Sequence, residues 1–294
     1  CLEMGDYARA QLSLKNYKEE GKSDPEYFKL LADSSFFGGN YHFALTCLLE
    51  LLRLIEAQKQ PSISLASTHN NIGSTYQALH QFEKAEEHFK KSMQCSPPDP
   101  NAYYNLASQC LAFERLNDAG EILFLLEKVA PTYRNLPFLR ARYHVEQRDY
   151  EHAIEDFKSA IKADPKDPRS YAGLSCMLSE IKYDYDQALD VVRSGLHFFP
   201  SNLGLLNNLA YNYLMKGDVY KGREILDSIK DPSAGTDLYI NATRGLLLIR
   251  EGALPEANRF YQLAISLAQE SEIKSKLKQK QNLELGRYWA NKGQ

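Results

Sequence analysis

Histidine and cysteine are the residues of this sequence with the most chemistry to offer, and their spacing fits neither a metal site nor a catalytic motif. None of the histidines forms HExxH or stands at metal-ligand spacing beside a cysteine or carboxylate. These histidines are His42, His69, His80, His88, His144, His152 and His197. The cysteines are odd in number, contain no CxxC pair and are far apart: Cys1, Cys47, Cys95, Cys110 and Cys176. We therefore expect no metal and no cofactor, and reduced thiols in a cytoplasmic protein.

Motifs for nucleotide binding and nucleophilic catalysis are also missing from the sequence. Gly21-Lys22-Ser23 has the ending of a phosphate-binding loop, but Asn16 stands where that loop needs its first glycine. Neither GxSxG nor GxGxxG occurs. Asn241-Ala242-Thr243 fits a glycosylation acceptor, yet it lies in a predicted helix, where we expect a packed side chain. We predict that the chain has no catalytic residue and is not an enzyme.

Charge and hydropathy exclude two further classes of partner. The net charge is −3, without the basic excess typical of a nucleic-acid binder. One lysine cluster exists, at Lys274, Lys276, Lys278 and Lys280, and its spacing predicts a solvated helix face. No apolar run approaches the roughly 20 residues that span a bilayer, and no signal peptide is visible. Cys1 is either the point where a longer chain was cut or a lipid-modified N-terminus; the periodicity described next favours a cut.

The dominant feature of the chain is a repeat of about 34 residues. One column of the repeat holds a small residue: Ala10, Ala44, Ala85, Ala119, Ala153, Ala188, Gly222 and Ala257. Twelve residues earlier, or thirteen for Ser175, lies a second small column: Ala32, Gly73, Ala107, Ala141, Ser175, Ala210 and Gly245. Proline follows four of the first-column residues by twelve: Pro97, Pro131, Pro165 and Pro200. Because these columns recur together about every 34 residues, we predict one structural unit in each period.

Helix packing explains these columns. Two helices of a hairpin approach closely where both carry a small residue, so the two small columns mark the crossing point. Larger residues at helical spacing, such as Tyr76, Phe82 and Phe89, fill the space around it. Proline after the second helix starts the next connection. Gly39, Gly217 and Gly252 fall in the predicted turns between the two helices, where a left-handed residue is favoured.

The segment from Asn70 to Pro97 resembles the tetratricopeptide repeat consensus, with Ile72-Gly73, Tyr76, Ala85 and the closing proline in place. The resemblance covers almost the whole chain. It implies an all-α fold, an α-solenoid in which antiparallel helix pairs wind into a right-handed superhelix. Residues 25–278 would form seven repeats, 1–24 the second helix of a preceding unit, and 279–294 the first helix of a following unit. About seven extra residues near Ala57–Leu65, with Pro61 among them, predict a lengthened helix or a longer connector. Such half-repeats at both ends indicate a fragment of a longer protein.

In this family, the concave face is lined by the first helix of each repeat and commonly binds ligands. The resemblance therefore assigns partner-binding roles to Lys29, Asn70, Asn71, Ser74, Tyr104, Asn105, Ser108, Arg142, Asn207, Asn208 and Tyr211. Asn71, Asn105 and Asn208 occupy equivalent positions, and an amide offers both a donor and an acceptor to an extended backbone. Neighbouring tyrosines offer flat, amphipathic contact area. The alternative left open is that these asparagines bond only to their neighbours within the protein.

Two features of this face bear on the kind of partner. The two-carboxylate clamp of chaperone-binding family members needs basic residues where Asn101 and Asn105 stand, so binding of chaperone tails is not expected. Arg142 is a groove cation that could meet an acidic group, or it could pair with Glu146 one turn along.

The sequence thus predicts a scaffold that holds an extended protein or peptide segment on a concave face. The alternative is a structural, assembly or regulatory repeat region, with self-association open, of a larger multidomain protein of bacterial type whose catalytic domain lies outside this chain. Exposed apolar residues on the concave face would favour capture of a peptide. On the convex face or at the termini, they would favour assembly.

Overall fold

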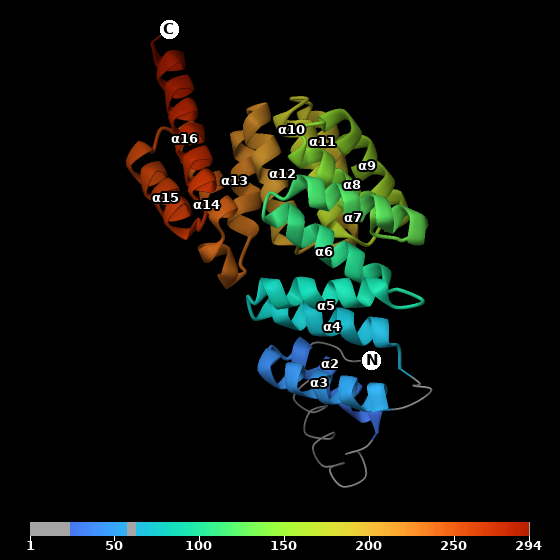
Figure 1. The fold of residues 1–294 in the computed structure, drawn as a ribbon. Helices are drawn as coiled ribbons and strands as arrows, with labels where there is room; N and C mark the ends of the chain where they lie inside the picture. The colour runs from blue at the N-terminus through green and yellow to red at the C-terminus, as the bar shows by residue number, and fades with distance from the viewer. Residues whose placement is uncertain (1–23, 58–62, 294) are drawn as a thin grey trace. The chain divides into compact units, whose positions relative to one another are not determined.

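The structure, a computed structural model, describes residues 24–57 and 63–293. Within these ranges it contains helices and no strand, which confirms the all-α prediction. The chain divides into two compact units, residues 1–147 and 148–294, and the elements of each unit are stacked in sequence order as helix hairpins (Figure 1). Residues 1–23 of the predicted N-terminal half-repeat, which include Cys1, lie outside the described residues, and so does Pro61.

Unit 1, residues 1–147, pairs α2 with α3, α4 with α5 and α6 with α7, and α8 packs against α6 and α7. Its helices are α2 Pro25–Phe37, α3 Tyr41–Ala57, α4 Leu65–Ala78, α5 Phe82–Gln94, α6 Pro100–Ala112, α7 Leu116–Val129 and α8 Leu136–Glu146. In the first pair, the second helix α3 has 17 residues, whereas α5, the second helix of the next pair, has 13. Part of the extra length predicted near Ala57 therefore lengthens α3.

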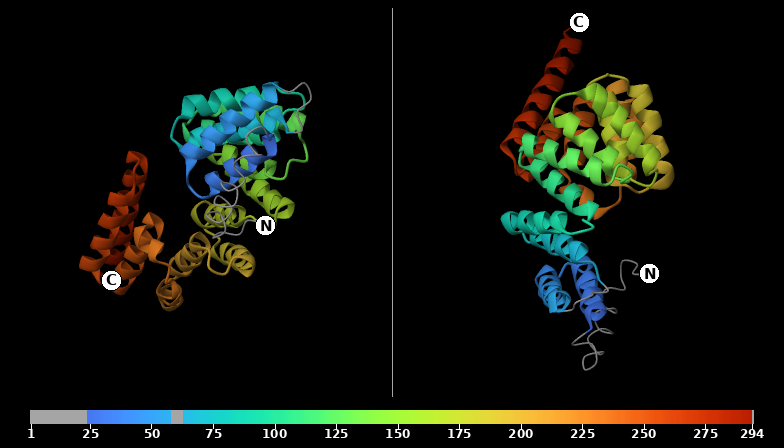
Figure 2. Two further views of the ribbon diagram at one scale, coloured as in Figure 1. Left: turned by 90° about the horizontal axis from the view of Figure 1, so that it is seen from below. Right: turned by 45° about the vertical axis from the view of Figure 1, so that its right-hand side comes forward.

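Unit 2, residues 148–294, pairs α10 with α11, α12 with α13 and α14 with α15. Its elements are α9 Tyr150–Ala163, α10 Pro168–Glu180, α11 Tyr185–Phe198, α12 Leu203–Lys216, α13 Val219–Ser228, the 3-10 helix η2 Pro232–Thr236, α14 Leu238–Glu251, α15 Leu254–Leu267 and α16 Ser271–Lys292. The last helix, α16, lies beside α14 and α15 in every view (Figures 1 and 2).

One predicted boundary is wrong. The division between residues 278 and 279 falls inside α16, which runs without interruption from Ser271 to Lys292. The stretch 271–285 contains neither glycine nor proline, so nothing in it ends the helix. The division into seven repeats stays a prediction.

The crossing points of the hairpins lie at the small residues that the repeat predicts. In unit 1, Ala44, Ala85 and Ala119 are at most 1% exposed. A Cβ atom on Gly73 of α4 would come within 2.6 Å of Phe89 Cε1 in α5, and one on Gly245 of α14 would come equally close to Tyr261 Cδ2 in α15. The close approach of the two helices therefore depends on the missing side chain.

The turn between the two helices of each hairpin contains one residue with a left-handed backbone. Glycine takes this conformation at the three positions that the sequence predicts, Gly39, Gly217 and Gly252, with φ of 78°, 91° and 82°. Ordinary residues take it in the other turns, with φ of 55–60°: His80, Glu114, Arg148 and Tyr183. The left-handed turn thus recurs even at positions where another residue type stands in place of glycine, the residue that favours it.

Proline and aspartate mark where the pairs are joined. Pro97, Pro131, Pro165 and Pro200 follow the ends of α5, α7, α9 and α11, as predicted. Several first helices then begin with an Asp-Pro pair, as in α6, where Asp99 accepts a hydrogen bond of 2.9 Å from Asn101 N. This N-cap leaves Pro100 at the first helical position, where its missing N–H costs nothing.

Candidate functional site

The first helices of the pairs present the surface to which the candidate binding residues belong. In unit 1, these residues lie on α2, α4, α6 and α8; in unit 2, they lie on α12. Each set is described within its own unit.

On unit 1, asparagine side chains link two neighbouring first helices. Asn105 Nδ2 on α6 donates to Asn70 Oδ1 at 3.0 Å and to Ser74 Oγ at 3.2 Å, both on α4. Asn70 Nδ2 in turn donates to Asn71 Oδ1 at 3.5 Å. Asn70 is buried, and the other three are half-buried. The alternative of bonding within the protein therefore holds for Asn70 and Asn105, whose amides connect α4 to α6.

Two further residues of this face lack such bonds. Ser108 Oγ on α6 is buried and has no hydrogen-bond partner. The Arg142 guanidinium on α8, half-buried, makes no ion pair or hydrogen bond with the described residues, so the alternative pairing with Glu146 is not formed. The unpaired cation leaves polar capacity for a partner, whereas the Ser108 hydroxyl is inaccessible from outside.

The remaining candidates of unit 1 are Lys29 on α2 and Tyr104 on α6. Lys29 on α2 pairs with Glu26 at 3.7 Å on the same helix. Tyr104 on α6 lies with its ring centroid 6.1 Å from that of Tyr133, whose hydroxyl donates to Asn101 Oδ1 at 2.8 Å. The tyrosine pair gives α6 an aromatic surface beside its amide.

On unit 2, the equivalent asparagines also bind the neighbouring first helix. Asn208 Nδ2 on α12 donates to the Ala172 carbonyl of α10 at 3.3 Å. Asn212, one turn along, donates to Ser175 Oγ at 3.2 Å and accepts from Ser179 Oγ. Asn207 is 8% exposed, and its Oδ1 has no partner.

Tyr211 belongs to a cluster that sequence analysis missed. Lys280 Nζ of α16 lies 4.1 Å from the centroid of the Tyr211 ring and 2.9 Å from Glu180 Oε1 at the end of α10. Burial, with the Glu180 carboxylate beside it, raises the pKa of Tyr211 well above its usual range. Lys280 therefore departs from the solvated helix face predicted for its lysine cluster. No local signal reveals this contact, because 100 residues separate Glu180 from Lys280.

The described histidines and cysteines form no group of three or more potential metal ligands with aspartate or glutamate. Two of them meet in a hairpin: His69 Nδ1 of α4 lies 3.1 Å from His88 Nδ1 of α5. Burial and the neighbouring imidazole lower the pKa of His88 to about 4. Burial raises the pKa of the Cys47 thiol to about 11, which disfavours the nucleophilic thiolate.

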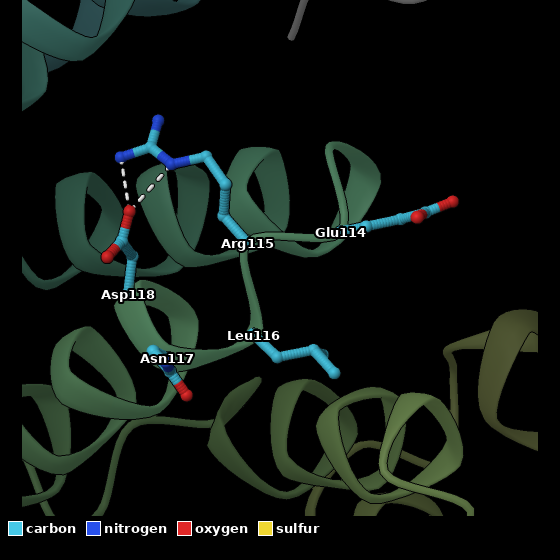
Figure 3. Close-up of a pocket in the computed structure, with 5 residues that line it drawn as sticks. All are labelled: Glu114, Arg115, Leu116, Asn117 and Asp118. Atoms are coloured by element: carbon cyan, nitrogen blue, oxygen red, sulfur yellow. Dashed lines mark hydrogen bonds and ion pairs between the residues drawn. The ribbon is translucent and has the colours of Figure 1, made fainter.

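Two other features, a pocket and a buried asparagine, do not involve the candidate binding residues. A pocket at the turn between α6 and α7 is lined by the consecutive residues 114–118, with Arg115 turned toward Asp118 and Glu114 pointing away (Figure 3). Arg115 Nε donates to Asp118 Oδ2 at 2.6 Å, and its other nitrogens bind Glu86 of α5. Asn241 is fully buried, with Nδ2 donating to two backbone carbonyls, so it is packed as expected.

Family models described as tetratricopeptide repeat match residues 27–97 and 138–175. Solved repeat structures match the fold as well. The chain contains tetratricopeptide repeats. A tetratricopeptide repeat protein from Parabacteroides merdae aligns over 90% of this chain and 100% of its own, with a TM-score of 0.63 and 17% identity.

Two larger proteins share the fold over most of this chain. Yeast Tom70 aligns over 96% of this chain and 59% of its own, with a TM-score of 0.60 and 13% identity. The human IFIT1 dimer with PPP-AAAA aligns over 91% and 70%, with a TM-score of 0.53 and 16% identity. At these identities, the likeness concerns the fold.

A relative in sequence is the DnaJ homolog subfamily C member 7 homolog of Dictyostelium discoideum, 20% identical over 174 residues. The match covers 56% of this chain and 32% of the relative, so it spans about a third of that protein's length. Among residues 24–57 and 63–293, no helix has the length and apolar character needed to cross a membrane.

Proposed function

We propose that this protein is a scaffold that holds an extended protein or peptide segment along the first helices of its repeats. The observation that carries the proposal is the composition of that face in unit 1. Helices α4 and α6 bear no charged side chain at all, only amide, hydroxyl, imidazole, aromatic and apolar groups. A peptide backbone consists of the same neutral donors and acceptors, whereas a nucleic-acid backbone needs cations.

Asn71 and Arg142 are the residues of this face that we propose to contact the partner. Neither of them bonds a neighbouring helix through its side chain, in contrast to Asn105 and Asn208. Arg142 would donate to a carboxylate or a backbone carbonyl, and Asn71 would bond the backbone. We propose no reaction at this face: it lacks a reactive thiolate, and its residues serve recognition. The cytoplasmic location stays part of the proposal.

The experiment selects binders from a displayed library of unstructured peptides and measures their affinity for the purified chain by fluorescence anisotropy. The combined variant Asn71→Ala, Arg142→Ala should bind about tenfold more weakly, because a charged hydrogen bond is lost from the interface. Its melting temperature should stay unchanged, because these side chains hold no neighbouring helix. Undiminished affinity contradicts the proposal.

A second candidate, assembly with other copies or domains, is favoured by the distribution of exposed apolar side chains. Among the first helices, α4, α6, α8, α10 and α12 carry none of the large ones, whereas α2 carries Leu30 and Phe37 and α14 carries Tyr239. On α7, the second helix of its pair with α6, three apolar side chains are exposed: Phe124 by 54%, Leu125 by 43% and Val129 by 43%. Phe124→Ser is therefore the matched variant for the peptide experiment. If it abolishes binding or alters the oligomeric state measured by light scattering while the variant Asn71→Ala, Arg142→Ala does neither, assembly replaces peptide capture.

A further inference from the structure

The cluster around Tyr211 in unit 2 has the parts of a receptor for an ammonium group. A carboxylate from α10 and an aromatic face from α12 converge on one Nζ atom. A carboxylate binds an ammonium group through a charge-assisted hydrogen bond, and a tyrosine face attracts it through the quadrupole of the ring.

The occupant of this receptor belongs to the protein itself. Lys280 extends from α16 and reaches Glu180, which is 100 residues earlier in the chain. The side chains of Lys280 and Glu180 remain 33% and 42% exposed, so solvent and solutes reach the contact. An ion pair at this exposure adds little stability and can open without unfolding.

Helix α16 does not depend on Lys280 for its position. Ile273 and Leu277 pack against an apolar cluster that includes Ala264 and Ala268, and Leu285 and Tyr288 pack beside Tyr261. The carboxylate of Glu284, 1% exposed, accepts hydrogen bonds from Arg250 of α14 at 2.7 Å and from Arg287 at 2.6 Å. The contact of Lys280 is thus additional to a helix that is already anchored.

We infer that Glu180 and Tyr211 form a binding site for a lysine side chain of a partner segment, and that Lys280 is an internal ligand which competes for it. The proposed site specifies which side chain of the partner binds at one point of the first-helix surface, and in this respect the inference rests on the proposed function. A lysine-bearing segment with further contacts along the surface displaces Lys280. In the absence of such a segment, Lys280 keeps the charge of Glu180 paired.

The test removes the internal ligand and supplies an external one. Lys280→Met keeps the aliphatic part of the side chain and deletes the ammonium group. The probe is the capped peptide acetyl-Ala-Lys-Ala-amide, titrated into full-length protein with isotope-labelled tyrosine rings and followed by the NMR signals of Tyr211. If Lys280 fills the site about four-fifths of the time, its removal raises the apparent affinity about fivefold.

Matched controls separate the site from general electrostatics. Lys278→Met makes the same charge change at an exposed residue of α16 and should leave the affinity at the wild-type value. The double variant Lys280→Met, Glu180→Gln should lose the gain, and acetyl-Ala-Gln-Ala-amide should not bind. Thermal melts of all variants check the fold.

Two results overturn the inference. In the first, Lys280→Met binds the lysine peptide no better than the glutamine peptide; in the second, Glu180→Gln leaves the gain intact. Neither result touches the proposed function, whose test rests on Asn71 and Arg142 in unit 1. Conversely, lysine binding at Tyr211 with undiminished peptide affinity in the unit 1 double variant would support this site and contradict the proposed function.

Discussion

The two units use the same hairpin but pair the polar groups of their first helices in different ways. In unit 1, neutral amides join α4 to α6 through Asn105, and the first-helix surface of these two helices carries no charge. In unit 2, amides join α10 to α12, and charged groups join α16 to α14 and to α10 through Glu284 and Lys280. The helix packing is fixed by the small residues at the crossings, so the surface chemistry is free to differ from repeat to repeat.

This difference has a consequence for stability. Neutral hydrogen bonds respond weakly to salt and pH, whereas buried charges depend on every partner being present. We therefore expect unit 2 to be the more sensitive to the loss of one charged side chain. Unit 1 should instead be sensitive to steric change at its crossings and to protonation of its one buried histidine pair.

The largest effect is expected for Glu284→Gln in unit 2. The substitution keeps the side-chain volume but leaves Arg250 and Arg287 without the carboxylate that accepts from both at 2.7 Å and 2.6 Å. We expect a loss of about 2–3 kcal/mol in the free energy of unfolding, measured by chemical denaturation. Hydrogen exchange should rise first in α14 and α16.

The control for this substitution lies on the same helix. Glu272 pairs with Lys276 at 2.7 Å in an exposed i,i+4 contact, and Glu272→Gln should leave stability unchanged. If Glu284→Gln is no more destabilising than this control, the buried ion network does not anchor α16, and the contrast between the units is lost.

The next effect compares one substitution at two glycines. Gly73→Ala in unit 1 places a Cβ atom 2.6 Å from Phe89 Cε1, a ring that is fully buried. We expect it to cost about 1–3 kcal/mol by overpacking. Gly286→Ala in α16 meets no atom within 4 Å and should stabilise the helix by about 0.5–1 kcal/mol.

Melting temperatures of the two variants give the check. Effects of opposite sign support the assignment of Gly73 to a close helix crossing. Should both glycines tolerate alanine equally well, the small-residue column would not mark the crossing, and the packing derived from the repeat would be wrong.

The fold of this protein could be predicted further from its sequence than the candidate site could. Small residues such as Gly73 and Ala153 recur with the period because the crossing recurs, so the repeat is visible in one sequence. The left-handed turns could be located only at Gly39, Gly217 and Gly252. His80, Glu114, Arg148 and Tyr183 take the same conformation, but their residue types carry no signal for it. The continuous α16 was missed because its start lacks the proline that marks other connections.

The positions of the site residues followed from the repeat, but their contacts did not. Asn105 lies on the expected first helix, and sequence alone left open whether its amide faces a partner or α4. The direction depends on side-chain conformation, which no periodic pattern encodes. The contact of Lys280 with Glu180 depends on how three first helices stack, and a long-range pair of this kind leaves no local pattern.

The smallest effect concerns pH and sets the histidine pair of unit 1 against an exposed histidine of unit 2. The pKa of His88 is lowered to about 4, and that of His69 is lowered too, because burial disfavours the imidazolium form. The unfolded chain, with an ordinary histidine pKa of about 6.5, binds more protons than the folded chain between these values. Stability contributed by the neutral pair is therefore complete above pH 6.5 and is lost as the pH falls toward 4.

We expect the free energy of unfolding to drop by on the order of 1 kcal/mol between pH 7 and pH 5 through this pair. His88→Gln keeps a hydrogen-bonding group beside His69 and removes one titrating group, so it should reduce the drop. His197→Gln, at an exposed position of α11, should not. Hydrogen exchange at pH 5 should show α4 and α5 opening before the helices of unit 2. A drop of equal size in both variants would mean that the acid sensitivity arises elsewhere, because only His88→Gln alters the buried 3.1 Å contact between the two imidazoles.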